Sequence, residues 1–465
     1  MNSNARDLGS FRDPCGHVYE KDGKIFRTVH DAGFENYVTV RDTGVIEALQ
    51  KKHFLIAGDE CDPVSVGLSM PQVRHVLEHP RIPFVSYPYE WSFSQLKQAA
   101  LLHLDLHLSA LEHNATLSDA SAYNVQFKGA KPVFIDTLSL IPYEEGTLWA
   151  GHRQFCEQFL NPLLLRAHFG IPHNTWYRGA MEGISACDLS ALLPWYKKIS
   201  WNVFAYVVLA ARLQDKAIAS HSESVETAKK QSLSKAQLTG ILKQLRRWIA
   251  GLLPKSQGAT VWGNYVETHT YASEEEREKR EFVARFVQQT QPSMLWDLGC
   301  NAGEYSQLSL ESGADYVVGF DFDQRAIERA YARAQEKDLA FLPLFLDASN
   351  PSGGQGWLGQ ERKSLTARSN ANAVIALAFE HHLAIGRNIP LMQVVDWLIE
   401  QAPTGVIEFI EKTDPTIQQM LALREDVFAD YSLETFTQAL VSRARIVETK
   451  VVSKHGRRLF WYDRS

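Results

Sequence analysis

The second half of the chain alternates between short apolar runs and amphipathic runs, and this alternation limits the folds it can adopt. From residue 294 the order is MLWDLG, a glycine turn, NAGEYSQLSLES, YVVGFD, QRAIERAYARAQEK and AFLPLFLD. The apolar runs have the length of buried strands, and the amphipathic runs have helical spacing. We expect further strands at ANAVIALAF and TGVIEFI, and a terminal pair at ARIVETKVV and RRLFWYD. The pattern predicts an α/β fold with a doubly wound parallel sheet, whose ligands bind at the carboxyl ends of the strands.

Acidic residues stand at the ends of three successive predicted strands. Asp297 lies in WDLGCNAGEYS, just before Gly299 and Gly303, where the backbone has to turn tightly. Asp321 ends the next strand, where a carboxylate can accept hydrogen bonds from both hydroxyls of a ribose. Asp347 ends the third strand, in a place suited to an exocyclic adenine amine. The three acids and the glycine turn together predict one nucleoside-binding site.

These residues resemble the class I S-adenosylmethionine-dependent methyltransferases, whose fold is Rossmann-like. The glycine turn of that family follows D-x-G-x-G-x-G, and here it is D-L-G-C-N-A-G, with Asn301 in place of the middle glycine. Asparagine tolerates left-handed backbone, so the turn is preserved. The resemblance implies S-adenosylmethionine as the cofactor, with Gly299 and Gly303 beside its methionine part, Asp321 at its ribose and Asp347 at its adenine.

A nicotinamide-dependent dehydrogenase is the competing class, because it also combines a glycine turn with a strand-end acid. Its G-x-G-x-x-G turn seats a pyrophosphate on a helix N-terminus, whereas here the helix begins at Glu304, which suits a pyrophosphate poorly. The methyltransferase interpretation is therefore favoured. A regulatory protein that binds the cofactor without turnover is a further alternative.

Two segments beside the predicted strands supply further candidate residues. In related methyltransferases a segment like WGNYVETHTYASEEEREKREFV folds over the cofactor, which makes Tyr271 and Lys279 candidate contacts; ordinary helix packing is the alternative. After the fourth strand, Glu380, His381 and His382 face the region of the methyl acceptor. Histidine titrates near neutral pH, so one of the two could be the base that a hydroxyl acceptor needs. A structural, cofactor-contacting role, common in the family, is the alternative.

The sequence also narrows the methyl acceptor. No N-P-P-Y or D-P-P-Y follows the fourth strand, which argues against methylation of adenine amines in nucleic acids. Cys300 lies in the glycine turn, so the covalent route to C5-methylcytosine is disfavoured. A net charge of -6 gives no global field for a phosphate backbone. We expect a hydroxyl-bearing small molecule or saccharide as the acceptor and no nucleic-acid partner; RNA or protein methylation is the alternative.

The first half carries a second pattern, in the stretch LSDASAYNVQFKGAKPVFIDT. An expected helix leads into Asp119, which is followed by Asn124 and then by Asp136 at the end of an apolar strand. This layout resembles protein kinases and aminoglycoside phosphotransferase-like enzymes. The resemblance implies Asp119 as a base and Asn124 and Asp136 as metal ligands, with Arg27 of CGHVYEKDGKIFRTV as a phosphate contact.

The kinase-like pattern departs from that family at several points. Leu117 stands where a histidine usually precedes the base, Asp136 is followed by Thr137 and Leu138 in place of Phe-Gly, and the phosphate hairpin holds one glycine. We therefore expect an α+β, kinase-like domain whose loop is a relic and which presents the acceptor. A bifunctional kinase–methyltransferase is the alternative. The segments SYPYEWSFSQLK, DASAYNVQF and VFIDTLS, together with the methyltransferase half, resemble bacterial nodulation-type methyltransferases.

Length and composition predict the domain plan and the compartment. A chain of 465 residues exceeds one ordinary core. A polar stretch at 214–235 indicates a linker between an N-terminal domain at 1–213 and a methyltransferase domain at 236–465. Five scattered cysteines without CxxC spacing indicate neither a zinc site nor a disulfide frame, and with no secretory pattern they fit a reducing cytoplasm. The longest apolar run, 199–213, is too short to span a membrane.

Overall fold

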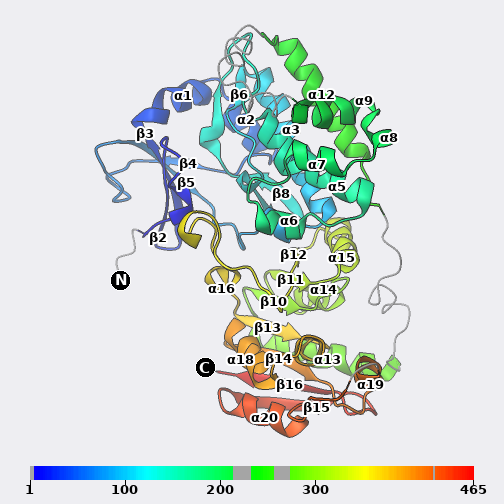
Figure 1. Cartoon of the computed structure of the whole chain (residues 1–465). Coiled ribbons are helices and arrows are strands. Elements are labelled where there is room, and N and C mark those ends of the chain that lie inside the picture. The colour runs from blue at the N-terminus through cyan, green and yellow to red at the C-terminus, as the bar shows by residue number, and fades with distance from the viewer. Residues whose placement is uncertain (1–4, 213–231, 256–272, 423–424, 465) are drawn as a thin grey trace. The chain divides into compact units, whose positions relative to one another are not determined.

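The computed structural model describes residues 5–212, 232–255, 273–422 and 425–464 (Figure 1). The chain divides into two compact units. Unit 1 comprises residues 1–127, 132–257 and 354–362, and unit 2 comprises residues 128–131, 258–353 and 363–465.

Unit 1 starts with an antiparallel sheet in the order β1-β2-β3-β5-β4. The predicted hairpin at CGHVYEKDGKIFRTV is present, because β2 and β3 pair across a turn in which Asp22 and Gly23 both have positive φ. The helices α1 and α2 lie between β3 and β4 in the chain. The bounds are β1 (Ala5–Arg6), β2 (Val18–Lys21), β3 (Lys24–His30), α1 (Asp31–Asp42), α2 (Val45–Lys51), β4 (Asp59–Cys61) and β5 (Val73–His79).

The rest of unit 1 is mainly helical and is organised around α3 (Phe93–Glu112). Ser92 starts this helix with a capping box, and its apolar positions are buried along most of its length. Two short pairs of strands follow, β6 with β9 and β7 with β8. The elements after α3 are β6 (Ala115–Leu117), β7 (Val125–Lys128), β8 (Lys131–Phe134), β9 (Leu140–Pro142), α4 (His152–Phe155), α5 (Asn161–Phe169), α6 (Asn174–Gly179), α7 (Ala186–Leu192), α8 (Trp195–Lys198), α9 (Trp201–Val203) and α12 (Lys235–Gly251).

The helix α12 corrects the predicted start of the second domain. Its leucine and isoleucine positions predict an amphipathic helix, which is confirmed, but its buried face packs against α3 of unit 1. An ion pair between Arg246 and Asp105 and a hydrogen bond from Lys97 Nζ to the Leu252 carbonyl (2.9 Å) hold it there. The boundary therefore moves from residue 236 to residue 258. Most of the predicted linker, residues 213–231, lies outside the described residues.

Unit 2 has the predicted doubly wound sheet, in the order β12-β11-β10-β13-β14-β16-β15. The first five of these strands are parallel, and β16 is antiparallel to both β14 and β15, as the terminal strand pair predicts. Because crossovers between parallel strands are right-handed, the reversal of strand order between β10 and β13 places helices on both faces. The strands are β10 (Leu295–Leu298), β11 (Val317–Asp321), β12 (Phe341–Phe345), β13 (Ala373–Ala376), β14 (Thr404–Phe409), β15 (Arg445–Val451) and β16 (Arg458–Asp463).

The helices of unit 2 follow the strands in the expected alternation, and the parallel strands are buried almost throughout. Within the described ranges, no helix is both long and apolar enough to cross a membrane. The helices are α13 (Ser273–Thr290), α14 (Glu304–Glu311), α15 (Gln324–Glu336), α16 (Leu365–Arg368), α17 (Glu380–Ala384), α18 (Leu391–Gln401), α19 (Pro415–Leu421) and α20 (Leu433–Val441).

Candidate functional site

The turn after β10 is tied to the acid that ends β11. Gly299, Asn301 and Gly303 have φ of 82°, 48° and 79°, so all three occupy the left-handed region. The backbone N–H of Asn301 donates to Oδ2 of Asp321 (2.8 Å), and the N–H of Asp323 donates to Oδ1 (2.8 Å). Burial raises the pKa of Asp321 to about 6. The turn and the carboxylate form one rigid arrangement.

The other two strand-end acids lie at the same edge of the sheet, because β10, β11 and β12 are adjacent and parallel. Asp297 is buried, accepts a hydrogen bond from Ser306 Oγ (2.6 Å), and has its pKa raised to about 7 by burial. Asp347 is half-buried, and its Oδ1 accepts hydrogen bonds from the N–H (3.1 Å) and the Oγ (2.6 Å) of Ser349. The structure thus brings together the three acids that the sequence singles out.

The residues predicted on the acceptor side begin α17. Glu380 is fully buried and accepts hydrogen bonds from the Ile410 N–H (3.1 Å) and the Tyr431 hydroxyl (3.0 Å); burial raises its pKa to about 8. His381 is buried, and neither of its ring nitrogens has a hydrogen-bond partner in the described part of the chain. His382 is half-buried, with its ring 4.1 Å from that of His381. Burial lowers the pKa of both histidines, that of His382 to about 4.

Lys279 of α13 makes a buried ion pair with Glu408 of β14, and its ammonium lies 5.4 Å from the centre of the Tyr305 ring. Sequence reasoning missed Glu408, although an acid inside the apolar strand TGVIEFI is a signal, since acids are rarely buried without a partner. Tyr271, the other cofactor contact predicted in this segment, lies outside the described residues.

Phe322 and Arg387 also lie beside the strand-end acids and were not predicted. Phe322 directly follows Asp321 and is 52% exposed. Its ring centre lies 5.8 Å from that of Phe345 and 5.7 Å from the guanidinium carbon of Arg387. The available signal was an aromatic residue placed between two acids in VVGFDFD.

In unit 1, the residues of the kinase-like pattern come together. Asn124 Nδ2 lies 3.2 and 3.3 Å from the two carboxylate oxygens of Asp119 and 3.5 Å from Oδ2 of Asp136. Arg27 of β3 pairs with Asp13 and lies 3.5 Å from Oδ1 of Asp136. Burial, followed by the charge of Asp136, raises the pKa of Asp119 to about 7. Asp13 was not predicted; its only signal is its place just before the hairpin.

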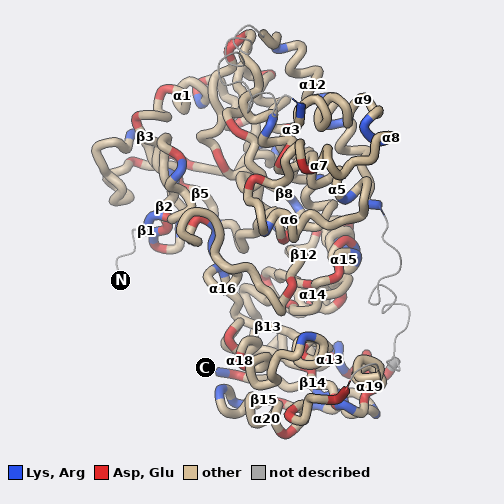
Figure 2. The backbone as a smooth tube through the Cα atoms, viewed as in Figure 1, with Lys and Arg blue, Asp and Glu red and all other residues tan. Residues whose placement is uncertain are grey.

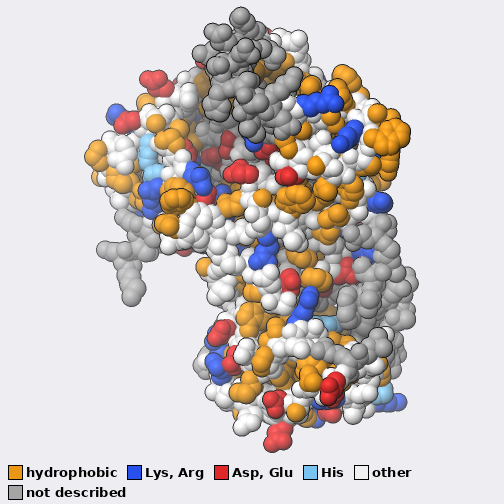
Figure 3. Space-filling model, viewed as in Figure 1, with side chains coloured by type: hydrophobic (Ala, Val, Ile, Leu, Met, Phe, Trp, Pro, Cys, Tyr) orange, Lys and Arg blue, Asp and Glu red, His pale blue; other side chains and the backbone are white. Residues whose placement is uncertain are grey.

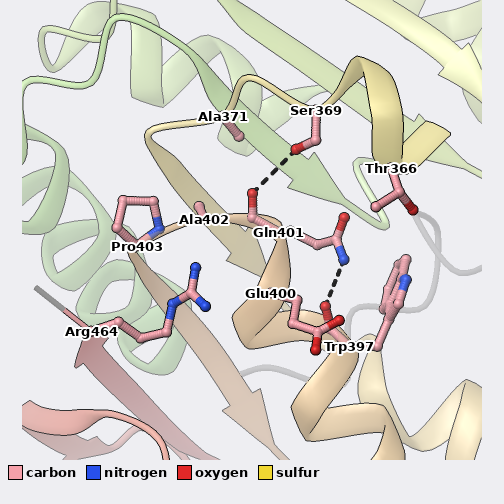
Figure 4. A pocket seen from close by; sticks show the side chains of 9 residues that line it. All are labelled: Thr366, Ser369, Ala371, Trp397, Glu400, Gln401, Ala402, Pro403 and Arg464. Atoms are coloured by element: carbon pink, nitrogen blue, oxygen red, sulfur yellow. Dashed lines mark hydrogen bonds between the residues drawn. The ribbon is translucent and has the colours of Figure 1, made fainter. Parts of the chain in front are cut away.

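A pocket of 290 Å³ lies elsewhere in unit 2 (Figure 4). Ala371 and Pro403, which line it, precede β13 and β14, so it lies at the amino ends of the strands and not at the acidic edge. Two hydrogen bonds join residues that line it: Ser369 Oγ donates to the Gln401 carbonyl (3.4 Å), and Gln401 Nε2 donates to the Trp397 carbonyl (2.6 Å). We therefore place the candidate site at the acidic edge.

No protein-family model matches the chain. Among solved structures, the N-methyltransferase NodS from Bradyrhizobium japonicum WM9 is 16% identical, with 41% of this chain and 97% of that chain covered and a TM-score of 0.31. The magnesium protoporphyrin IX methyltransferase ChlM from Synechocystis PCC 6803 is 16% identical, with 45% and 86% covered and a TM-score of 0.30. These scores are low, so neither likeness carries an argument.

A curated relative matches much more closely. The nodulation protein NoeA of Rhizobium meliloti (strain 1021) is 43% identical to this chain over 460 residues. The match covers 99% of this chain and 96% of the relative, so both units are included. The chain belongs to the family of the nodulation protein NoeA.

Proposed function

We propose that unit 2 binds S-adenosylmethionine at the carboxyl ends of β10, β11 and β12 and transfers its methyl group to a hydroxyl-bearing small molecule or saccharide. The observation that carries this proposal is the hydrogen bond between the Asn301 N–H and Asp321, which fixes the glycine turn against the strand-end acid. A carboxylate has about four acceptor positions, so Asp321 can still accept two ribose hydroxyls. The donor and acceptor groups at this edge therefore suit a nucleoside.

Each residue at the acidic edge has a proposed part in holding the cofactor. Asp321 binds the ribose hydroxyls, and Asp347 accepts a hydrogen bond from the adenine amine. The exposed ring of Phe322 offers a face on which the adenine stacks. Asp297 fixes β10 against α14 through its hydrogen bond with Ser306. When bound, S-adenosylmethionine supplies an electrophilic methyl group.

Lys279 is a positioning residue in this proposal. Its ammonium forms a buried ion pair with Glu408, and this pair holds α13 against β14. The chain's main catalytic task is to hold the donor and the acceptor hydroxyl in line.

We assign the base for a hydroxyl acceptor to His382. The Glu380 carboxyl is occupied by Ile410 and Tyr431, and His381 is buried, whereas His382 is only half-buried. A neutral imidazole can accept a proton, and the low pKa of His382 keeps it neutral at physiological pH.

Methyl transfer from labelled S-adenosylmethionine into a cell extract tests the proposed activity. The extract is fractionated by size after treatment with ribonuclease or protease. We expect label in small molecules or saccharides that survive both treatments. Label found only in RNA or only in protein would refute the acceptor class, and binding of the cofactor without any transfer would identify a regulatory protein.

One observation favours a second candidate function, in unit 1. Asp119, Asn124 and Asp136 converge as in the phosphotransferases that the sequence resembles, so unit 1 is proposed to be kinase-like. The guanidinium of Arg27, however, already pairs with Asp13 and Asp136, where a kinase would place a cation. We therefore propose that phosphoryl transfer has been lost and that unit 1 presents the acceptor. A bifunctional kinase–methyltransferase is the alternative.

A further inference from the structure

Large apolar side chains lie exposed close together in α8, in α9 and between them. Trp195 is 76% exposed, Tyr196 56%, Ile199 74% and Trp201 71%. We call these four residues the aromatic patch. Single exposed apolar residues are ordinary, but a contiguous group of large ones marks an interaction surface.

The local fold keeps the aromatic patch turned outward. Leu193 and Val203, on either side of the patch in sequence, are buried and fill the inward positions. Backbone hydrogen bonds from the Lys197 N–H to the Pro194 carbonyl (2.9 Å) and from the Phe204 N–H to the Ser200 carbonyl (2.8 Å) fix the turns between them. The exposed rings therefore have no inward position available to them without breaking this packing.

The chain around the aromatic patch is basic although the whole protein is acidic. Residues 189–212 contain Lys197, Lys198 and Arg212 and no acidic residue, while the whole chain has a net charge of -6. Aliphatic side chains accompany the rings: Leu192 is 46% exposed and Leu209 is 42% exposed. The patch thus joins aromatic, aliphatic and cationic groups in one short stretch.

The neighbouring helix α12 extends the positive charge. It packs beside the patch segment through a hydrogen bond from Gln244 to Asn202 (3.0 Å) and through the rings of Trp248 and Tyr206, 5.9 Å apart. Figure 2 shows Lys and Arg positions along α8, α9 and α12, and the space-filling view of Figure 3 shows basic side chains on this part of the surface with apolar side chains gathered beside them. Residues 232–255 contain no acidic residue and five basic ones, of which Arg246 is paired with Asp105, so the positive charge comes from the other four: Lys235, Lys243, Arg247 and Lys255.

We propose that the aromatic patch docks unit 1 onto an anionic lipid membrane. Tryptophan and tyrosine are the side chains that settle at the boundary between headgroups and acyl chains, and lysines beside them bind anionic headgroups. Single-stranded RNA would also attract rings and cations, but aliphatic side chains such as Ile199 and Leu192 cannot stack on bases, whereas they can enter acyl chains. The mixture of groups therefore favours lipid.

Co-sedimentation of the full-length protein with vesicles tests the proposal. One set of vesicles contains equal parts of phosphatidylcholine and phosphatidylglycerol, and the other contains phosphatidylcholine alone. The test variant is Trp195→Ser with Trp201→Ser, and the charge variant is Lys197→Gln with Lys198→Gln. Trp357→Ser is the matched control, because Trp357 also belongs to unit 1 and is 65% exposed but lies outside the patch.

We expect the protein to sediment with the anionic vesicles and much less with phosphatidylcholine. The tryptophan variant should lower this partition about tenfold or more, and the lysine variant should lower it and reduce its dependence on salt. The Trp357→Ser control should bind like the unaltered protein. No binding to anionic vesicles, an equal loss in the control, preferential binding of polyuridylate, or self-association that depends on Trp195 and Trp201 would each overturn the proposal.

Discussion

The backbone N–H of Asn301 lies 2.8 Å from Oδ2 of Asp321, so the glycine turn after β10 is hydrogen-bonded to the end of the neighbouring strand. The other oxygen of the same carboxylate accepts the N–H of Asp323. The acid is therefore held in place before a ligand arrives, and preorganisation of this kind lowers the entropic cost of binding. One residue thus serves both the turn and the proposed ribose contact.

Cofactor affinity should depend on pH through Asp321, whose pKa burial raises to about 6. Ribose hydroxyls bond more strongly to the ionised carboxylate, so binding should weaken as the pH falls through this value, by up to about tenfold per pH unit. Calorimetric titrations with S-adenosylmethionine on both sides of this pH measure the effect. Asp321→Asn should bind more weakly and with a flatter pH profile. If the affinity of the unaltered protein for S-adenosylmethionine stays constant as the pH falls, Asp321 does not bind the ribose.

Breaking the buried ion pair of unit 2 should destabilise it strongly. Lys279→Met leaves Glu408 buried without its cation, which should cost about 3 to 5 kcal/mol of the free energy of unfolding. Adding Glu408→Gln to the Lys279→Met variant should restore a large part of the lost free energy of unfolding, because the buried carboxylate is then removed. Urea unfolding measures both. The control is Arg285→Met on the same helix, whose pair with Glu448 is partly exposed and should contribute about 0 to 1 kcal/mol. Equal effects at both positions would contradict the structural role of Lys279.

The stability of unit 2 should fall as pH rises toward 8 because of Glu380. Burial raises the pKa of its carboxyl from 4.5 to about 8 in the folded protein. Between these two values the folded state binds more protons than the unfolded state, so the contribution is complete at the acidic end and is lost as pH rises. Glu380→Gln should therefore make the free energy of unfolding less dependent on pH in this range, by up to about 1.4 kcal/mol per pH unit. The free energy of unfolding, measured with urea, is plotted against pH for the unaltered protein and for Glu380→Gln. Equal slopes would show that the Glu380 carboxyl is already ionised in the folded protein.

Magnesium and ATP should raise the melting temperature little, because Arg27 already pairs with Asp13 and Asp136. A ligand at a hundred times its dissociation constant would add about 2.7 kcal/mol, which a thermal shift assay detects. Arg27→Met should increase the shift by releasing both carboxylates. Magnesium-dependent ATP turnover by the unaltered protein, abolished by Asp119→Asn and by Asp136→Asn, would make unit 1 an active kinase.

The sheet of unit 2 and its acidic edge could be predicted from the sequence because both signals are local. Strands buried on both faces are continuous apolar runs, and parallel strands in neighbouring positions bring their end residues together. Asp297, Asp321 and Asp347 therefore lie at one edge, as their spacing predicts.

What could not be predicted depends on contacts between distant segments. Lys279 and Glu408 are 129 positions apart, and the sequence around each residue does not indicate that the other is its ion-pair partner. The spacing in α12 shows that one face is buried, but it does not show that α3 of unit 1 covers that face, so the sequence alone does not assign α12 to unit 1. The pair of Arg27 with Asp13 was missed for the same reason.

Isothermal titration of the full-length protein with S-adenosylmethionine tests the central claim most directly. We predict one site per chain, and we predict that Asp321→Ala weakens it by removing charge-assisted hydrogen bonds to the ribose, each worth roughly 1.5 to 3 kcal/mol. Tight binding of NADH with no binding of S-adenosylmethionine would contradict the claim and assign the acidic edge of unit 2 to a dehydrogenase.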